Sequence, residues 1–242
     1  ELVWFSLDPD NDTIAAHTSA GGLAFVLDGD ELVKLEGSAR VILCRSHEIP
    51  ITFGGAARHN VANALAAAAL TWCMGTSLQD IQNGLVTMAQ DENPGRCNLF
   101  DVDGRGVIVD FAHNPAAMAA LFDIARAVPA KRRVLCFGQA GDRTDELIRE
   151  LARDAWAIGL DRVIVSELAA YHRGRDHGEV FGLIRGELLK AGAADSQIAH
   201  FETEMESFES AIDWAQPGDL VIMLALSGAA PIEERLKALG AE

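Results

Sequence analysis

The stretch GVIVDFAHNPAAMAALFDIARA, residues 106–127, decides the fold. It opens with a short and mostly apolar run, Val107–Phe111, which is typical of a strand buried in a sheet. Asn114 then suits a helix N-cap and Pro115 suits the first helical position, so residues 115–127 are predicted to form a helix. A buried strand followed directly by a capped helix is the repeating unit of an α/β domain.

The same unit repeats toward the C-terminus, where short apolar runs alternate with helical patterns. The predicted strands are 134–137, 162–165, 197–201 and 220–224, and the helices that follow them are predicted at 145–158, 178–189, 205–214 and 231–239. A further strand at 98–102 is predicted to pair with the strand at 107–111. This alternation predicts a doubly wound domain, with a mostly parallel sheet covered by helices on both faces.

The first 92 residues follow a different pattern of short strands and two helices. Strands are predicted at 2–7, 23–27, 32–35, 41–44 and 49–53, with a hairpin turn at Asp28-Gly29-Asp30. Helices are predicted at 60–73, with Asn60 as N-cap, and at 77–89, with Ser77 as cap. The polar loop 91–95 marks a boundary between residues 1–92 and residues 93–242. The predicted fold class is therefore α/β, a C-terminal doubly wound domain preceded by a smaller α+β part.

Composition limits the classes of partner. The chain has 242 residues, 49% of them hydrophobic, which is enough to bury one or two cores. Its formal net charge of −16 disfavours nucleic acid and anionic membrane as partners. The four cysteines form no CxxC pair, and no metal-ligand spacing joins them to the histidines, so no metal site is expected. Scattered cysteines are also typical of a reducing compartment, so we expect a cytoplasmic protein. Five of the seven histidines are expected on the surface or in the core, namely His17, His47, His172, His177 and His200.

Polar residues gather after several predicted strands, in the loops 112–115, 138–143, 171–177 and 227–228. Ligands of open α/β sheets bind beyond the carboxyl ends of the strands, so these loops predict a cleft at that edge. Asp110, at the end of its strand, is suited to accept hydrogen bonds from ribose hydroxyls. The alternative is that the segment 110–115 is simply a well-capped turn between strand and helix.

Three other groups of residues are candidates for ligand contacts. Arg96, after Gly95, offers a bidentate fork to a phosphate, unless the pair is only a linker turn. Asn60 and Asn63 share one helix face and suit an adenine edge, unless Asn60 merely caps the helix. Two arginines in a loop can hold a carboxylate, unless the loop is a solvated basic turn. They lie in Arg173-Gly174-Arg175, and Arg143 in the 138–143 loop is a similar case.

Taken in order along the chain, these motifs resemble those of the Mur ligase family. GAARHNVANALAAA (55–68) is similar to the family's adenine-side helix, NPGRCN (93–98) to its PGR element, and VDFAHNP (109–115) to its DYAHNP signature. The last of these is the most specific match. GDR (141–143), followed by two carboxylates, and RGR (173–175) resemble loops of one branch, the Mur-like region of cyanophycin synthetases. The resemblance covers essentially the whole chain.

The resemblance implies an ATP-dependent ligase that activates a carboxylate as an acyl phosphate and transfers it to an amine. Arg96, at the transferred phosphate, and His113 are the implied catalytic residues. The implied nucleotide contacts are Asn60 and Asn63 to adenine, Asp110 to ribose, Arg96 to phosphate, and Asn114 in the cleft. The implied contacts to the incoming amino acid are Arg143, Arg173 and Arg175.

The chain departs from the family in what it lacks. No GxxxxGK[ST] phosphate loop occurs in it, and in the family this loop, the Mg²⁺ ligands and a modified lysine lie further upstream. LALSGA (224–229) differs from the Lys-Gly-His element of the cell-wall enzymes, and the 173–175 loop differs from the DNPR pattern of diaminopimelate-adding ones. Glu1 opens inside a strand pattern, so we expect a truncated chain whose partner is the upstream half of the same protein.

The sequence therefore predicts the C-terminal part of an ATP- and Mg²⁺-dependent ligase that is inactive alone. Its two parts would be the end of the central ATP-binding domain, residues 1–92, and the C-terminal Rossmann-like domain, residues 93–242. The first alternative is a non-catalytic nucleotide- or amino-acid-binding module derived from a Mur ligase. The second is an unrelated Rossmann-like domain. The amino acid added, the acceptor and the oligomeric state, including a homo-oligomer, stay open.

Overall fold

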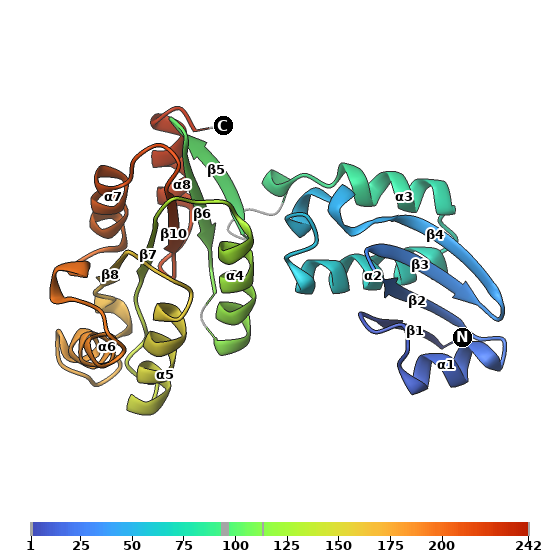
Figure 1. Ribbon diagram of the computed structural model, residues 1–242, viewed down its shortest axis with the longest axis horizontal. Helices are drawn as coiled ribbons and strands as arrows, with labels where there is room; N and C mark the ends of the chain where they lie inside the picture. The colour runs from blue at the N-terminus through green and yellow to red at the C-terminus, as the bar shows by residue number, and fades with distance from the viewer. Residues whose placement is uncertain (1, 93–96, 113, 242) are drawn as a thin grey trace. The chain divides into compact units, whose positions relative to one another are not determined.

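The computed structural model describes residues 2–92, 97–112 and 114–241. The chain divides into two compact units, Glu1–Glu92 and Asn93–Glu242. Each unit has its own sheet and its own hydrophobic core (Figure 1). Among the described residues, no helix combines the length and the apolar character needed to cross a membrane.

The first unit is built on a four-stranded sheet with the strands in chain order. They are β1 (Val3–Ser6), β2 (Leu23–Asp28), β3 (Glu31–Glu36) and β4 (Ala39–Arg45). The strands β2, β3 and β4 form an antiparallel meander, while β1 runs parallel to β2 at the edge. The predicted hairpin lies between β2 and β3, where Gly29 adopts a φ of 63° that favours glycine.

Helices cover both faces of this sheet. Leu23, Phe25 and Leu27 of β2 point toward α2 (Arg58–Cys73) and α3 (Leu78–Thr87), and they belong to one core with buried residues of both helices. The alternate residues of β2 pack with Ile14 of α1 (Asp12–Ser19). Because successive side chains of a strand point to opposite faces, the apolar residues 23–27 of β2 are buried on both sides.

Two elements of the first unit differ from the prediction. The helix α1 was not predicted, because it is only eight residues long and Ile14 is its single buried side chain, so it lacks an apolar repeat. Residues 49–53 do not form a strand, since two short 3₁₀ helices, η1 (Ser46–Glu48) and η2 (Pro50–Thr52), occupy this region. Pro50 lacks an N–H for a strand ladder and is suited to the first position of a helical turn.

The second unit contains a six-stranded sheet in the order β5-β6-β10-β7-β8-β9. Its strands are β5 (Asn98–Val102), β6 (Arg105–Asp110), β7 (Arg133–Phe137), β8 (Arg162–Ser166), β9 (Ile198–Phe201) and β10 (Leu220–Leu224). The strand β5 is antiparallel to β6, and every other neighbouring pair is parallel. This confirms the predicted α/β class and its mostly parallel sheet.

Chain direction explains which helices cover which face of the second sheet. From β6 the chain steps outward through β7, β8 and β9, and then returns to insert β10 between β6 and β7. Right-handed crossovers therefore place the outward connections on one face and the return on the other. The outward helices are α4 (Pro115–Ala127), α5 (Asp145–Trp156) and α6 (Glu179–Lys190), and the opposite face carries α7 (Glu204–Trp214) and α8 (Ala230–Ala238) (Figure 1).

Both faces of the central strands are therefore buried. Val221 and Met223 of β10 pack with Phe208 of α7 and Ile232 of α8, while Ile222 points to the other face and is fully buried. The parallel arrangement brings the carboxyl ends of β6, β7, β8, β9 and β10 to one edge of the sheet. The loops that leave these strands contain most of the candidate site residues.

Candidate functional site

Two loops at the carboxyl edge, following the neighbouring strands β7 and β8, are joined to each other. The Gly141 N–H donates to the Tyr171 carbonyl at 2.9 Å. The Arg175 Nε donates to the Gly141 carbonyl at 2.8 Å, and its Nη2 donates to the Arg143 carbonyl at 2.8 Å. Together with a hydrogen bond from Arg173 to Asp142, these contacts connect the 138–143 loop to the 167–178 loop and bring the sequence-predicted arginines into two joined loops.

The three arginines differ in how far their side chains are engaged. Arg175 also forms ion pairs with Asp145 at 2.9 Å and Glu179 at 2.6 Å, so each of its three nitrogens has a partner and its side chain is 15% exposed. The hydrogen bond from Arg175 holds the pKa of Asp145 below its ordinary value. Arg175 is therefore placed to hold the two loops and the beginnings of α5 and α6 together, rather than to release its donors to a ligand.

Arg143 and Arg173 are the more accessible cations of this group. Arg173 pairs with Asp142 and lies over the Tyr171 ring at 5.5 Å, and 48% of its side chain is exposed. Its φ of 48° is in the left-handed region. The Arg143 side chain is exposed and has no hydrogen-bond or ion-pair partner among the described residues. An exposed guanidinium with free donors is suited to bind a carboxylate in bidentate fashion.

A buried carboxylate, Glu167, anchors the second loop. It follows β8 directly and is 6% exposed. One of its oxygens accepts from His172 Nε2 at 2.7 Å and from the Gly178 N–H at 3.2 Å, and the other accepts from His200 Nε2 at 2.9 Å. The three donors come from the middle of the loop, its end, and the neighbouring strand β9.

These donors determine the charge state of Glu167. Burial alone raises the pKa of a carboxyl group, but hydrogen bonds from Gly178, His200 and His172, together with the nearby His177, outweigh burial. The pKa of Glu167 therefore lies below its ordinary value, and the group is ionised at neutral pH.

A second buried carboxylate, Glu204, anchors the loop after β10. It is 7% exposed and accepts hydrogen bonds from the Leu226 N–H at 2.6 Å and the Ser227 N–H at 2.9 Å. Burial raises the pKa of Glu204, and its donors offset part of that rise. Glu204 thus fixes the backbone of the 225–228 loop, which also follows a central strand.

The residues predicted to contact the nucleotide have clear local roles. Asp110 is buried, and its Oδ2 accepts from the backbone N–H of Cys97 at 2.8 Å and from the Cys97 Sγ at 3.2 Å. Asn114 caps α4, as predicted, with its Oδ1 accepting from the Ala117 N–H at 3.0 Å. Contacts of Asp110 and Asn114 with a nucleotide stay predictions.

The asparagine pair lies in the first turn of α2, and the predicted capping by Asn60 is wrong. A cap at Asn60 would require the helix to begin at residue 61. The helix begins at Arg58 instead, and Ala57 is the cap residue. The Asn60 Nδ2 instead donates to the Ile51 carbonyl at 2.7 Å, and the Asn63 Nδ2 lies 3.4 Å from the Asn60 Oδ1. Asn63 is exposed, so its amide oxygen is accessible on this face.

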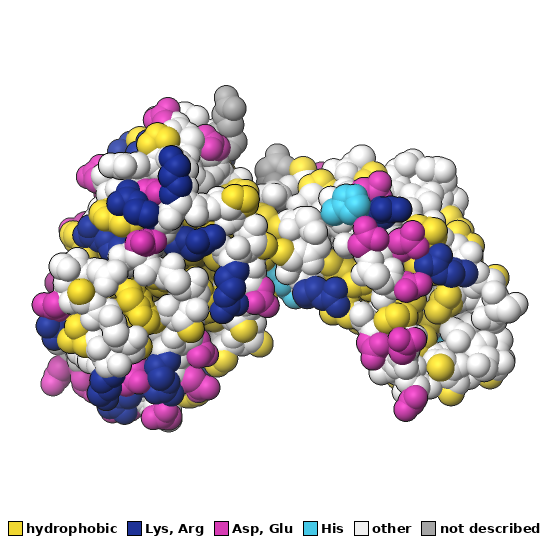
Figure 2. All heavy atoms as spheres, viewed as in Figure 1, with side chains coloured by type: hydrophobic (Ala, Val, Ile, Leu, Met, Phe, Trp, Pro, Cys, Tyr) yellow, Lys and Arg dark blue, Asp and Glu magenta, His cyan; other side chains and the backbone are white. Residues whose placement is uncertain are grey.

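Two predicted residues, Arg96 and His113, lie outside the described residues, so their predicted catalytic roles stay predictions. Within residues 2–92, 97–112 and 114–241, no group of three or more His, Cys, Asp or Glu side chains is placed to hold a metal ion. On the face shown in Figure 2, the basic and acidic side chains of the described residues are interspersed.

Glu167, His172 and His200 were not predicted as a group. The histidines were expected on the surface or in the core, because their spacing in the sequence shows no pattern. The sequence contains one signal for Glu167, because this carboxylate comes directly after a predicted parallel strand, where site residues of α/β domains gather. That His200 lies beside Glu167 follows only from the pairing of β8 with β9.

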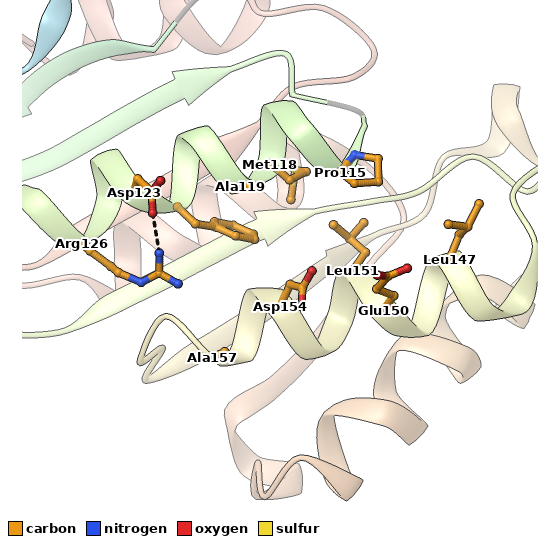
Figure 3. A pocket seen from close by; sticks show the side chains of 11 residues that line it. Pro115, Met118, Ala119, Asp123, Arg126, Leu147, Glu150, Leu151, Asp154 and Ala157 are labelled. Atoms are coloured by element: carbon orange, nitrogen blue, oxygen red, sulfur yellow. Dashed lines mark hydrogen bonds and ion pairs between the residues drawn. The ribbon is translucent and has the colours of Figure 1, made fainter. Parts of the chain in front are cut away.

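A groove of about 170 Å³ lies between α4 and α5, away from the joined loops (Figure 3). Met118, Phe122 and Leu151 contribute apolar side chains to it, and Glu150 and Asp154 contribute carboxylates. None of the described residues that were predicted for the site lines this groove.

Comparison with known proteins identifies relatives of this chain. A family model described as the Mur ligase, glutamate ligase domain matches residues 95–225, more than half of the chain. The chain belongs to the Mur ligase family. The matched residues begin just before β5 and end just after β10, so they include the whole six-stranded sheet and the joined loops. This confirms the family that the VDFAHNP segment resembles.

Individual Mur ligase relatives refine the comparison. The cyanophycin synthetase of Crocosphaera subtropica is 34% identical over 226 residues, covering 92% of this chain and 25% of that protein. That of Synechocystis sp. is 33% identical over 236 residues, covering 96% and 26%. These matches confirm the predicted similarity to cyanophycin synthetases, and the chain spans about a quarter of their length.

A solved structure shares the fold of this Mur ligase chain. The structure of E. coli FolC in complex with ADP has a TM-score of 0.63 and 16% identity, covering 93% of this chain and 52% of FolC. At this identity the likeness shows the fold alone.

Gly141→Ala is expected to destabilise the joined loops. A Cβ at this position would lie 2.0 Å from the His172 carbonyl oxygen, so one backbone segment must move, at a cost of about 1–3 kcal/mol. Gly182→Ala in α6 is the matched control, because a Cβ there meets nothing within 4 Å and alanine favours a helix by up to about 1 kcal/mol. Urea unfolding measures both changes, and equal effects would contradict this packing.

The contribution of Glu167 to stability is expected to depend on pH. Folding lowers the pKa of this group, so the stabilisation is present above the ordinary glutamate value of 4.5 and is lost as the pH falls through the folded-state pKa. At pH 7, Glu167→Gln is expected to reduce the free energy of unfolding by about 1.5–3 kcal/mol. The difference between wild type and variant should shrink below pH 4.5 in denaturant titrations. A difference that grows on acidification would refute the assignment.

Proposed function

We propose that this chain is the C-terminal part of an ATP-dependent ligase, similar to cyanophycin synthetase, that joins a carboxylate to an amine. The observation that supports this most is the pair of joined loops at the carboxyl edge. Arg175 ties the loops together, and each loop retains one accessible arginine, Arg143 in the first and Arg173 in the second. Two guanidinium groups at that edge are suited to bind the carboxylate of an incoming amino acid.

In this proposal the chain orients the amine component. The carboxylate takes the γ-phosphoryl group of ATP to form an acyl phosphate and release ADP, and the amine then attacks the acyl carbon while phosphate leaves. Holding the amino acid by its carboxylate fixes its amine relative to the activated carbonyl and reduces the entropic part of the barrier. Arg96 would contact the transferred phosphoryl group, where a cation offsets developing negative charge, and His113 is the second catalytic candidate.

The nucleotide contacts are proposed for residues of both units. Asn63 presents an exposed amide next to Asn60, which suits the hydrogen-bonding edge of adenine. Asp110 has one carboxylate oxygen engaged by Cys97, which leaves the other for ribose hydroxyls. Asn114, the N-cap residue of α4, is a further candidate in the second unit. Support for a nucleotide comes from the fold shared with FolC, which was solved in complex with ADP.

The remaining ligase functions are assigned to sequence upstream of this chain. The sequence lacks a GxxxxGK[ST] loop, so the grip on the γ-phosphate and the Mg²⁺ ligands are proposed to lie upstream. We assign residues 1–92 to the end of a central ATP-binding domain and residues 93–242 to the C-terminal domain. Trp4 and Phe5 of the edge strand β1 are 39% and 48% exposed, which suits an edge that the upstream half would cover.

The 242-residue chain is expected to release no phosphate from ATP above background with any amino acid, because it lacks the γ-phosphate grip. The test is ATP turnover and amide formation by this chain, and by a longer chain that includes the upstream sequence. Amide formation by the 242 residues alone would overturn the proposal. Nucleotide or amino-acid binding without turnover by the longer chain would favour a non-catalytic binding module.

Arg143→Ala is expected to weaken amino-acid binding to the chain about tenfold, since one charge-assisted contact is lost. L-Aspartate and L-arginine are suitable probes, with binding followed by changes in backbone amide NMR shifts. Arg126→Ala is the matched control, because Arg126 lies on α4 and pairs with Asp123 at 2.7 Å, outside the joined loops. Equal affinities for wild type and Arg143→Ala would remove Arg143 from the site.

A further inference from the structure

One carboxylate closes the loop that contains Arg173 and Arg175. Glu167 begins this loop, and the Gly178 N–H at its end donates to the same Glu167 oxygen that accepts from His172 near its middle. The ends and the middle of an eleven-residue excursion, 168–178, are therefore fixed to a single buried group.

The other oxygen of Glu167 is fixed to rigid elements. It accepts from His200 of β9, and the His200 ring stacks on the Phe181 ring of α6 with 4.1 Å between centroids and 5° between planes. His200 therefore has little freedom to turn away from Glu167. Since a buried carboxylate that loses a donor is not readily compensated by water, the arrangement resists local opening.

His172 transmits this fixed position to the arginines. Its side chain donates to Glu167, and its carbonyl accepts from the Arg175 N–H at 3.0 Å and packs against Gly141. The next residue is Arg173, whose left-handed backbone sets the direction of its side chain. The position of His172 thus determines the direction of the Arg173 side chain and the packing of the 167–178 loop against Gly141.

We propose that Glu167 is a positioning residue, which through His172 holds the Arg173 loop against the Arg143 loop. The role of these arginines in binding an amino acid rests on the function proposed above, but the positioning itself does not. Glu167 acts through His172 and is buried beneath the loop, so we do not assign it as a ligand of the amino acid.

A neighbouring pair supplies an internal control. His177 lies in the same loop, and its Nε2 is 3.0 Å from a carboxylate oxygen of Glu202. Both side chains are more than half exposed, and this hydrogen bond does not involve Glu167. An exposed pair of this kind contributes little to the stability of the folded chain, so removing it should leave the loop in place.

The test is amide hydrogen exchange of the 242-residue chain at neutral pH, read at Gly141 and Gly178. His172→Ala removes the donor to Glu167 and is expected to speed exchange at both amides about tenfold or more. His172→Gln retains a side-chain N–H donor and is expected to restore protection to within about twofold of wild type. Glu202→Gln is expected to leave both amides unchanged.

The outcomes separate positioning from a general effect on stability. Faster exchange confined to the two loops, with rescue by His172→Gln, supports the proposal. Equal loss of protection in the amides of β7 and β10, or no change in His172→Ala, overturns it. Titration with L-aspartate and L-arginine adds a second readout, since His172→Ala should weaken binding and His172→Gln should not. Absence of binding by wild type would overturn the proposed function, while the exchange data still decide the role of Glu167.

Discussion

The candidate site depends above all on the guanidinium group of Arg175. Adjacent parallel strands bring two loops to the same edge of a sheet, but they do not fix the loops relative to each other. Arg175 does so, because its planar fork reaches the Gly141 and Arg143 carbonyls as well as the carboxylates of Asp145 and Glu179. With these contacts in place, Arg143 and Arg173 are accessible in one region of the surface.

Buried carboxylates provide the second constraint on this edge. Glu167 and Glu204 follow β8 and β9, Asp110 is the last residue of β6, and each accepts at least one backbone N–H from a loop or segment at the carboxyl edge. Carboxylates are suited to this task because one oxygen can accept from several donors. The high acidic content of the chain thus contributes to loop structure in addition to surface charge. An anionic ligand at this edge would therefore rely on nearby arginines for its binding energy.

The sequence predicted most of the second unit, because each of its strands and helices has a local signal. The apolar run before Asp110 and the Asn114-Pro115 cap are examples, and both depend on residues close in the chain. Local signals also led to error, since Asn60 looks like a cap but bonds to the Ile51 carbonyl instead. The Glu167 contacts could not be predicted, because His200 reaches Glu167 only through the pairing of β8 with β9.

The most direct measurement is amide exchange at Gly141 in an Arg175→Lys variant, combined with titration by L-aspartate and L-arginine. Lysine keeps the positive charge but lacks the planar guanidinium group. The hydrogen bonds to the Gly141 and Arg143 carbonyls would therefore be lost, while a simple ionic contact with a ligand would remain. Exchange at Gly141 should become about tenfold faster or more, and amino-acid binding should weaken as a consequence. Unchanged protection at Gly141 together with weakened binding would contradict this, and would make Arg175 a ligand rather than the clamp between the loops.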